Sequence, residues 1–385
     1  MRALADAAAR DGFEVVEFRQ SHGEPPTGPS RLVTLERSAP ACREEMRPRP
    51  TWVRRWARGV TPFAVRYSLG FSRETRRLSD VLRRCPVDVL HTSETGCEES
   101  AVAARLAGIP AVIGTLHVLP EVDVEHRQQG WIHRRLERRG VHALDLAIAV
   151  CEAGRTAWMR RTGLPSSRIV TVHNGINTRE FQRRRAATEA RRALGLPTDD
   201  EAVVIGTLAR LARVKGLESL ISAAACLRAQ GSNVRVVIAG SGPLLEELRQ
   251  LAAREGLGPR VHFLGNQADV PPVLEAFDIF ALPSRSEALP YAVMEAMAME
   301  LPVVATEVGG VPEIVAPDET GFLVPAGSAE ALAATVRPLI ESAALRQRMG
   351  LAGRRRVVEL FDERRMADRT VGLYRSLMRR RRVCA

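Results

Sequence analysis

Short apolar runs alternate with amphipathic stretches along most of this chain. Helical patterns such as ALADAAARDG near the start and EAGRTAWMRRTG at 152–163 stand between runs rich in valine and isoleucine. Such alternation predicts a parallel sheet with helices on both of its faces. In the first half, the runs that predict strands cover residues 13–18, 87–91, 110–117, 145–150 and 167–172.

A second alternating series begins at residue 201, after the polar and charged stretch 182–200, whose short helix ends at Gly195 and Pro197. We therefore predict two doubly wound, Rossmann-like domains, at 1–181 and 201–362, joined by a linker at 182–200. A helix at 363–385 is expected to pack back toward the first domain. In such folds ligands bind at the carboxyl ends of the strands, so we expect a central cleft between the domains. The predicted strands of the second half cover 201–206, 234–240, 260–265, 277–283, 301–307 and 321–325.

The stretch 283–313 carries the strongest chemical signal. Pro290 fits the first turn of a helix, and the following run, YAVMEAMAM, is apolar on every face except at Glu295. A carboxylate in a buried helix needs hydrogen-bond donors or a counter-charge. Glu287 lies in the loop before that helix, close to N–H groups that have no partner within the helix. Two carboxylates beside a helix N-terminus predict a site for a polyhydroxylated ligand that carries phosphate.

Two cations follow the strand at 201–206. Arg210 and Lys215 flank a turn that closes at Gly216 and opens a helix, so both are expected at the carboxyl end of that strand. A planar guanidinium and a compact ammonium together suit a diphosphate. Lys215 is also the only lysine in the chain, which makes its retention conspicuous. Arg213, between the two, is interpreted as a surface residue.

The run VVIAGSGPLLEEL has the form of a strand, a glycine turn and a helix. It matches a dinucleotide fingerprint poorly, because Leu245 follows Gly240 and Gly242 where a third glycine is required. We interpret the two glycines as a tight turn that lets a nucleotide base approach the backbone.

Composition limits the partners, metal sites and cellular locations that the protein could have. The formal net charge of +11 attracts acidic partners, but aromatic residues are only 4% and no RNA-binding signature accompanies the arginines, so no nucleic acid is expected. Six scattered cysteines form no metal-like cluster, and no apolar run is long enough to span a membrane. These features predict a cytoplasmic protein without a metal site.

An arginine-rich segment between Cys42 and Cys85 interrupts the alternating pattern. Trp52, Trp56 and Phe63 are interleaved with its arginines, as is Tyr67. One hypothesis is peripheral contact with an anionic membrane, with aromatic rings at headgroup depth. The alternative is a surface excursion with half-buried aromatic rings.

Several motifs in the second half resemble retaining glycosyltransferase family 4, which has the GT-B fold. They stand in the order and spacing of that family, and the resemblance is looser before Leu144. VDVLH, the strand that ends in His117 and VHNGIN at 172–177 are similar to its N-terminal landmarks. The motifs of the second half are RLARVKG, VVIAGSGPL, VHFLG, the long run FDIFALPSRSEALPYAVMEAMAMELPVVATEVGGVPEIV and GFLVPAG.

The resemblance implies a role for each candidate residue. Glu295 would hold the nucleotide ribose, and Glu287 would meet sugar hydroxyls or the charge that develops near the anomeric carbon. Arg210 and Lys215 would neutralise the departing diphosphate, and His117 would lie near the donor sugar. Backbone N–H groups at the helix start would meet sugar or phosphate oxygens; these residues are Ala288, Leu289, Pro290 and Tyr291.

The implied reaction is retaining transfer from a nucleotide-diphosphate sugar, with no metal and no cofactor. The acceptor would be a carbohydrate, a lipid-linked molecule or a small molecule, in polysaccharide, glycolipid or glycoconjugate biosynthesis. The first domain would bind the acceptor and the second the nucleotide sugar. One alternative is a GT-B protein that binds a nucleotide sugar without transferring it. Another, a pyridoxal-dependent phosphorylase, needs a Schiff-base lysine, for which Lys215 is the only candidate.

The chain departs from the family pattern at three places. Ala288 stands where the family commonly has glycine, which narrows the backbone conformations beside the sugar. Glu300 stands where a glycine commonly ends the helix, so the end of that helix is expected to lack a left-handed residue. The third is the family's first strand and glycine-rich loop, which have no counterpart before residue 3, so either the start lies upstream or neighbouring strands close the gap.

Three other polar positions have plain structural interpretations. His91 is expected to be structural, and Asn174 with Gly175 to form a turn beside the cleft. Glu313 would ordinarily be a solvated or capping residue, although its motif position also allows a contact near the ligand.

Overall fold

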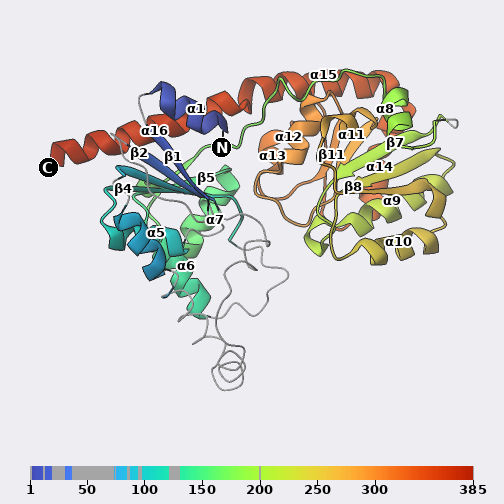
Figure 1. Ribbon diagram of the computed structural model, residues 1–385. Helices are drawn as coiled ribbons and strands as arrows, with labels where there is room; N and C mark the ends of the chain where they lie inside the picture. The colour runs from blue at the N-terminus through green and yellow to red at the C-terminus, as the bar shows by residue number, and fades with distance from the viewer. Residues whose placement is uncertain are drawn as a thin grey trace. The chain divides into compact units, whose positions relative to one another are not determined.

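The computed structural model of the protein contains two compact units (Figure 1). One unit combines Met1–Val172 with Met366–Ala385, and the other is His173–Arg365. The aromatic residues of the arginine-rich segment, including Trp52 and Trp56, lie outside the described residues. The structure describes residues 2–11, 14–19, 31–36, 73, 75–84, 87–93, 98–120, 131–198 and 201–384.

The first unit is built on a six-stranded parallel sheet whose strands follow in chain order. The predicted gap is closed among the described strands, because β2 pairs directly with β3 from Leu32–Val89 to Glu36–Ser93. The strand β2 was not predicted from the sequence. The strands are β1 (Glu14–Arg19), β2 (Arg31–Glu36), β3 (Val89–Ser93), β4 (Ala111–Leu116), β5 (Leu146–Ala149) and β6 (Ile169–Thr171).

Two apolar clusters cover the two faces of this sheet. Alternate residues of a strand point to opposite faces, so Leu90 packs in the cluster that contains Trp158, and Val89 in the cluster that contains Tyr374. The C-terminal helix thus belongs to this unit through its buried Tyr374. Its helices among the described residues include α1 (Arg2–Arg10), α5 (Glu98–Ala107), α6 (Trp131–Ala143), α7 (Glu152–Thr162), the short η1 (Ser166–Arg168) and, from Met366 on, α16 (Glu363–Cys384).

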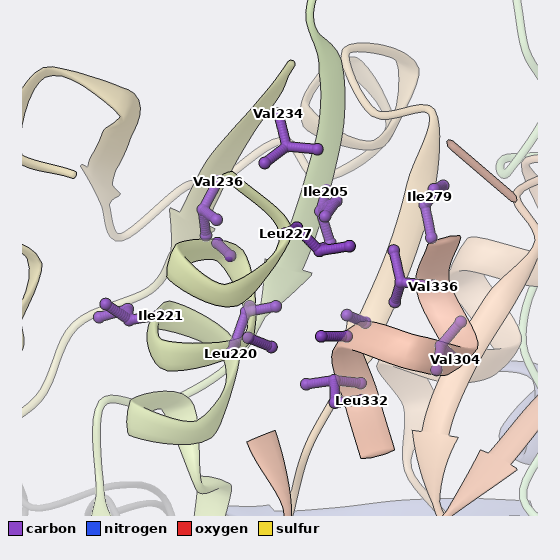
Figure 2. Close-up of a cluster of buried hydrophobic side chains, with 14 of the residues drawn as sticks. Ile205, Leu220, Ile221, Leu227, Val234, Val236, Ile279, Val304, Leu332 and Val336 are labelled. Carbon is purple, nitrogen blue, oxygen red and sulfur yellow. The ribbon is translucent and has the colours of Figure 1, made fainter. Parts of the chain in front are cut away.

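The second unit contains another six-stranded parallel sheet, in the order β12-β11-β10-β7-β8-β9. The order reverses at β7, where doubly wound sheets place a ligand crevice. Figure 2 shows the core under one face, where Leu220 and Leu227 meet Ile205 and Val236. The strands are β7 (Val203–Leu208), β8 (Val234–Ala239), β9 (Val261–Gly265), β10 (Ile279–Leu282), β11 (Val303–Thr306) and β12 (Gly321–Val324).

Helices and short helical turns connect these strands and follow them along the chain. They are α8 (Ala187–Ala193), η2 (Arg213–Lys215), α9 (Leu217–Ala229), α10 (Leu245–Arg254), η3 (Gly258–Arg260), α11 (Pro271–Glu275), α12 (Tyr291–Ala298), α13 (Val311–Ile314), α14 (Ala329–Glu341) and α15 (Ala343–Leu360).

The division between the units lies at Val172 and His173, earlier than the predicted linker at 182–200. The stretch interpreted as a linker is anchored on the second unit by charge. Arg185 Nε donates to the buried Glu275 Oε2 at 2.8 Å, and Arg191 Nη2 to Asp278 Oδ2 at 2.5 Å. The arginines in this stretch predicted a solvated linker, but two of them, Arg185 and Arg191, bind it to the second unit.

The end of α12 differs from the prediction. Glu300 itself adopts the left-handed conformation, with φ of 61°, so the helix does have such a residue despite the missing glycine. Arg354 compensates the unfavourable acid, because its guanidinium donates to the carbonyl of Ala298 and lies 3.8 Å from Glu300 Oε1. Gly350 makes room for this turn, since a Cβ there would stand 2.0 Å from the Glu300 carbonyl oxygen.

Candidate functional site

A cavity of about 400 Å³ opens at the carboxyl ends of β7, β8 and β9, beside α12. It brings together four of the predicted residues, Arg210, Gly240, Tyr291 and Glu295. The remaining predicted donor-site residues do not line it. The cavity is lined by Leu208, Ala209, Arg210, Ala239, Gly240, Ser241, Asn266, Gln267, Val270, Tyr291, Ala292 and Glu295.

Glu295 lies in the middle of α12, whose other face is buried through Val293, Met294 and Met297. Burial, reinforced by the nearby Glu180, raises the pKa of Glu295 to about 7. The carboxyl group therefore changes its charge near neutral pH. Groups that hydrogen-bond to a carboxylate, such as ribose hydroxyls, would favour its ionised form and compensate its burial.

A second polar group lies at the end of β10. Lys215 Nζ is 2.6 Å from Glu287 Oε1, and Ser284 Oγ donates to the same oxygen at 2.6 Å. The Glu287 side chain is 9% exposed, so the ion pair is well shielded from solvent. Lys215 and Glu287 were predicted to act on different parts of the ligand, and the structure joins them directly.

The backbone on both sides of this ion pair is tightly constrained. Gly216 has φ of 59°, and a Cβ at that position would stand 2.2 Å from the carbonyl oxygen of Pro283. The Arg285 N–H donates to the carbonyl of Val214 at 2.7 Å. Only glycine fits the first contact without strain, so the turn that carries Lys215 and the loop that carries Glu287 are held together by their main chains.

The loop before α12 is held by its carbonyl groups. The Ala288 carbonyl accepts from the Gly310 N–H at 2.8 Å, and the Leu289 carbonyl from Asn174 Nδ2 at 3.3 Å. Within the described chain, the N–H groups of Ala288 and Leu289 donate no backbone hydrogen bond. Pro290 is the last residue before the helix, with ψ of 121°, rather than part of its first turn. It also has no N–H, so it is removed from the predicted set of donors.

Gly240 and Gly242 are required by the packing of their own turn, whether or not a nucleotide base approaches it. Gly240 has φ of 137°, and a Cβ there would meet the Ala209 carbonyl oxygen at 2.0 Å. A Cβ on Gly242 would meet the Leu211 carbonyl oxygen at 2.4 Å. The two glycines therefore let this turn pack against the segment after β7, and only Gly240 also lines the cavity.

The two arginines of the turn after β7 differ in their surroundings. Arg210 lines the cavity and makes no ion pair with any other described residue. Arg213 is 66% exposed and lies 3.4 Å from the exposed Glu247, which confirms its interpretation as a surface residue. The cavity is therefore open to an anionic ligand at the Arg210 side.

Two family models match the chain. The model described as Glycosyltransferase Family 4 matches residues 1–180, and the model described as Glycosyl transferases group 1 matches residues 188–356. Alpha-D-kanosaminyltransferase from Streptomyces kanamyceticus is 30% identical over 300 residues, covering 73% of this chain and 76% of the relative. The chain belongs to the group 1 glycosyltransferases.

Solved structures place this glycosyltransferase in the GT-B fold. Sucrose-phosphate synthase from Thermosynechococcus elongatus has a TM-score of 0.73 at 22% identity, covering 98% of this chain and 92% of that one. HepE from Anabaena, crystallised in complex with UDP, has a TM-score of 0.71 at 21% identity and covers 94% of this chain and 100% of its own.

Two histidines of the first unit of the glycosyltransferase, His91 and His117, have different surroundings. The ring of His91 is buried, with Nδ1 2.5 Å from the Tyr374 hydroxyl and Nε2 2.7 Å from Thr115 Oγ1, which confirms its structural role. Burial, with a smaller effect from His117, lowers the pKa of His91 to about 3. His117 follows β4 and lies 2.8 Å from Ser93 Oγ, and burial lowers its pKa below the ordinary value.

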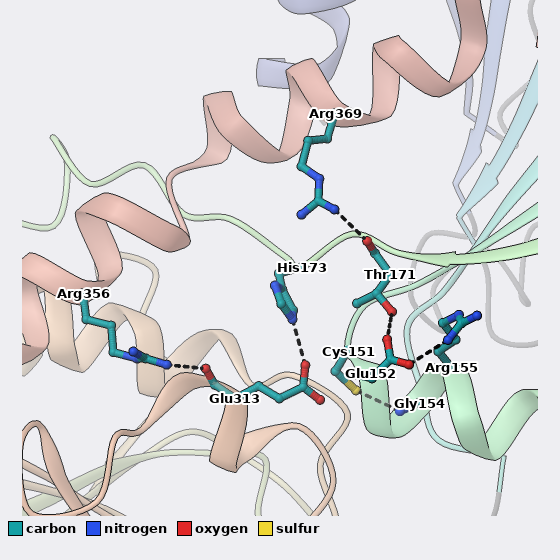
Figure 3. A network of polar contacts seen from close by, with 9 residues as sticks. All are labelled: Cys151, Glu152, Gly154, Arg155, Thr171, His173, Glu313, Arg356 and Arg369. Atoms are coloured by element: carbon teal, nitrogen blue, oxygen red, sulfur yellow. Dashed lines mark hydrogen bonds and ion pairs between the residues drawn. The ribbon is translucent and has the colours of Figure 1, made fainter. Parts of the chain in front are cut away.

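Glu313 has a defined structural environment in the second unit. Its Oε2 lies 2.8 Å from His173 Nε2, and its carbonyl oxygen accepts from Arg356 Nη2 at 3.0 Å, as Figure 3 shows. Asn174 and Gly175 are likewise packing residues and do not form the turn that the sequence predicted. Asn174 is 5% exposed, and a Cβ on Gly175 would stand 2.6 Å from the Glu363 backbone.

Among the residues of the site that sequence reasoning missed are Asn266, Gln267 and Ser284. Asn266 and Gln267 line the cavity because they directly follow β9, and the end of the run VHFLG was the signal that could have located them. Ser284 was part of a quoted motif, but a serine three residues before a glutamate has no spacing rule that predicts their contact.

The described residues provide neither a cluster of metal ligands nor a membrane-spanning helix. No group of three or more His, Cys, Asp or Glu side chains is arranged to hold a metal ion within that part of the chain. Among the helices that the structure describes, none is long and apolar enough to cross a membrane.

Proposed function

We propose that this glycosyltransferase moves a sugar from a nucleotide-diphosphate donor to an acceptor hydroxyl, with retention of the anomeric configuration. The observation that carries the proposal is the combination of the Glu295 cavity with the Lys215–Glu287 pair, both at the carboxyl ends of strands in one unit. Glu295 suits a ribose, the Lys215 ammonium a diphosphate and the Glu287 carboxylate a sugar. A protein that needed only to hold a nucleotide would have no use for the third.

The nucleotide half of the donor fits the cavity. Glu295 would accept hydrogen bonds from the ribose hydroxyls, with Gly240 at the base side and Arg210 toward the phosphates. The N–H groups of Ala288 and Leu289 would donate to sugar or phosphate oxygens, because their carbonyl groups already anchor the loop. HepE from Anabaena, which shares the fold, is crystallised with UDP, with UDP and glucose, and with UDP-glucose.

The transfer step would proceed on one face of the sugar. The bond between the anomeric carbon and the diphosphate oxygen breaks, and the acceptor oxygen bonds to the same face. The acceptor proton passes to the departing diphosphate oxygen. Lys215 and Arg210 would stabilise the charge that develops on the diphosphate, and Glu287 the positive charge on the sugar ring.

The proposed reaction uses no metal ion. Two cations, Arg210 and Lys215, are available for the charge on the diphosphate that Mg²⁺ commonly neutralises in other phosphate sites. The expected result is that transfer is unchanged by excess EDTA. Loss of activity in EDTA, restored by Mg²⁺ or Mn²⁺, would contradict this part of the proposal.

The acceptor is proposed to be a carbohydrate, a lipid-linked molecule or a small molecule, reached at the cytoplasmic face of an anionic membrane. The contact with anionic lipid is supported by exposed arginines on α6, at positions 134, 135, 138 and 139. The one acid between them, Glu137, is buried and paired with Arg161, so it does not offset their positive charge at the surface. Co-sedimentation with liposomes is expected to increase with the fraction of anionic lipid. Binding that is independent of lipid charge would contradict the contact.

The decisive experiment separates binding from transfer. Thermal shift with UDP, GDP and ADP identifies the base, and the anomeric configuration of the product by NMR tests retention. We expect Glu295→Ala to remove the stabilisation by nucleotide, because the ribose loses its acceptor. An unchanged shift in this variant would overturn the site. A wild-type protein that binds a nucleotide sugar but neither transfers nor hydrolyses it would be a binding protein instead.

A further inference from the structure

The residue that fixes Glu287 is Ser284, at the end of β10. Ser284 is completely buried, and its hydroxyl donates to Glu287 Oε1 at 2.6 Å. Its carbonyl oxygen accepts a hydrogen bond from the hydroxyl of Thr306, which is also buried and ends the neighbouring strand β11. Ser284 is thus held by the sheet, and it holds the carboxylate in turn.

The two oxygens of Glu287 are unequal. Oε1 has two donors, Lys215 Nζ and Ser284 Oγ, each at 2.6 Å, which uses both of its lone pairs. Oε2 has no hydrogen-bond partner among the residues that the structure describes. The carboxylate therefore presents a single free oxygen.

We infer that Ser284 is a positioning residue, which keeps Glu287 in place while Lys215 binds the diphosphate of the donor. The inference rests on the proposed function and adds a residue to it. An ammonium has three N–H groups, and the carboxylate uses one, so two remain for phosphate oxygens. The lysine stem is flexible, and a carboxylate held by Lys215 alone would move with it. The buried serine removes that freedom.

This arrangement assigns the two Glu287 oxygens different tasks. Oε1 stays bound to Ser284 and couples the carboxylate to the lysine that meets the leaving group. Oε2 faces the donor sugar, where it accepts from a hydroxyl or stabilises the positive charge of the ring. Loss of the serine hydroxyl should therefore affect the transfer step more than the binding of nucleotide.

The test is the variant Ser284→Ala, assayed with the nucleotide sugar that the wild-type enzyme uses. We expect kcat to fall about ten- to hundredfold, the range for one lost hydrogen bond to a charged group. The Kd of the corresponding nucleoside diphosphate should stay within about twofold, because Lys215 and Glu295 are intact. Ser284→Cys, which keeps a weak donor, should recover part of the loss.

Ser100→Ala is the matched control. Ser100 is also completely buried and has one hydroxyl partner, Thr92 at 2.7 Å, but it belongs to the other unit and does not touch Glu287. Its kcat should remain near the wild-type value, whereas Thr306→Val, which releases the Ser284 carbonyl, should show a smaller loss than Ser284→Ala.

Two results would overturn the inference. One is a Ser284→Ala variant with unchanged kcat, and the other is a parallel loss of kcat and nucleotide binding, which would mean a general structural role. If Ser284→Ala does not fold, unchanged kcat in both Ser284→Cys and Thr306→Val overturns it. A wild-type protein that binds nucleotide sugar without transferring it would refute the proposed function instead, and is recognised before any variant is compared.

Discussion

The two units treat a buried titratable side chain in opposite ways. In the first unit, His91 has a protein partner on each ring nitrogen, the hydroxyls of Tyr374 and Thr115. In the second, Glu295 faces a cavity of about 400 Å³, and burial raises its pKa to about 7. One polar group is satisfied within the fold. The other lines a cavity.

Glu295 and His91 also make opposite contributions to the change of folding stability with pH. As pH rises from 4.5 to about 7, folded Glu295 keeps its proton and the unfolded chain loses it, so stability falls. The full shift corresponds to about 3 kcal/mol. As pH falls from 6.5 to about 3, the unfolded chain protonates His91 and the folded protein does not, so stability falls again. The largely buried Glu295 therefore lowers stability at neutral pH, whereas the neutral imidazole of His91 does so only in acid.

The largest expected effect separates function from stability. Lys215→Ala should lower transfer by about a thousandfold or more, because a preorganised charge at the leaving group is lost. The protein should still fold, since Ser284 still donates to Glu287, but its melting temperature should fall because the shielded Glu287 loses its counter-charge. Steady-state kinetics and calorimetry measure the two quantities.

Arg213→Ala is the matched control, because Arg213 is two residues away, 66% exposed and paired only with Glu247 among the residues described. It should keep nearly full activity. Equal losses in the two variants would mean that general positive charge, rather than the placement of Lys215, supports the reaction.

The second effect is on stability alone. His91→Ala should lower the free energy of unfolding by about 2–4 kcal/mol, because it leaves a cavity and removes the hydrogen bonds of the imidazole with the Tyr374 and Thr115 hydroxyls. Urea unfolding measures this change. Tyr374→Phe keeps the ring packing and removes one hydroxyl, so it should cost less. A His91→Ala protein as stable as the wild type would end the contrast between the two units.

The pH dependence of unfolding tests the same contrast without removing the side chain's volume. Wild-type stability should fall below pH 6.5 with a contribution from His91 of at most about 1.4 kcal/mol per pH unit. His91→Gln should remove this contribution. A pH profile that is identical in the variant would show that another group is responsible.

Binding of nucleotide should release a proton. Free Glu295 is mostly protonated at pH 6, and ribose hydroxyls that donate to it favour the ionised form. Affinity should therefore rise as pH increases toward 7, by up to about tenfold per unit. Calorimetry at pH 6 in two buffers of different ionisation enthalpy measures the released proton. The release should vanish in Glu295→Gln; if it persists, it comes from the nucleotide phosphate or another group.

Sequence reasoning reached much of the second unit because local spacing reports on strand ends. Arg210, Gly240 and Glu295 each stand at a fixed distance from an apolar run, and doubly wound sheets gather the ends of such runs. The contact of Ser284 with Glu287 depends on rotamers within a loop, which no spacing fixes. In the first unit, β2 was missed because a six-residue run with two charged ends gives a weak strand signal.

The unit boundary was misplaced for a related reason. A run of arginines with no apolar period is typical of a linker, and the sequence does not show which carboxylates it meets. Glu275 and Asp278 of the second unit bind Arg185 and Arg191, so the whole stretch from His173 belongs there. Composition predicts that such a segment is polar but not where its partners are.

The smallest expected effect concerns the end of α12, the helix that carries Glu295. Glu300→Gly should raise the free energy of unfolding by about 0.5–1 kcal/mol, because φ of 61° strains a side chain and suits glycine. Glycine adds entropy to the unfolded chain, which limits the gain. Glu341→Gly, at an exposed position in the last turn of α14, should instead lose a similar amount. If the left-handed conformation of Glu300 destabilises the protein, urea unfolding should show that Glu300→Gly raises the free energy of unfolding and that Glu341→Gly lowers it. Destabilisation of both would mean that the contact of Glu300 with Arg354 outweighs the strain, and that this helix end is stabilised by charge.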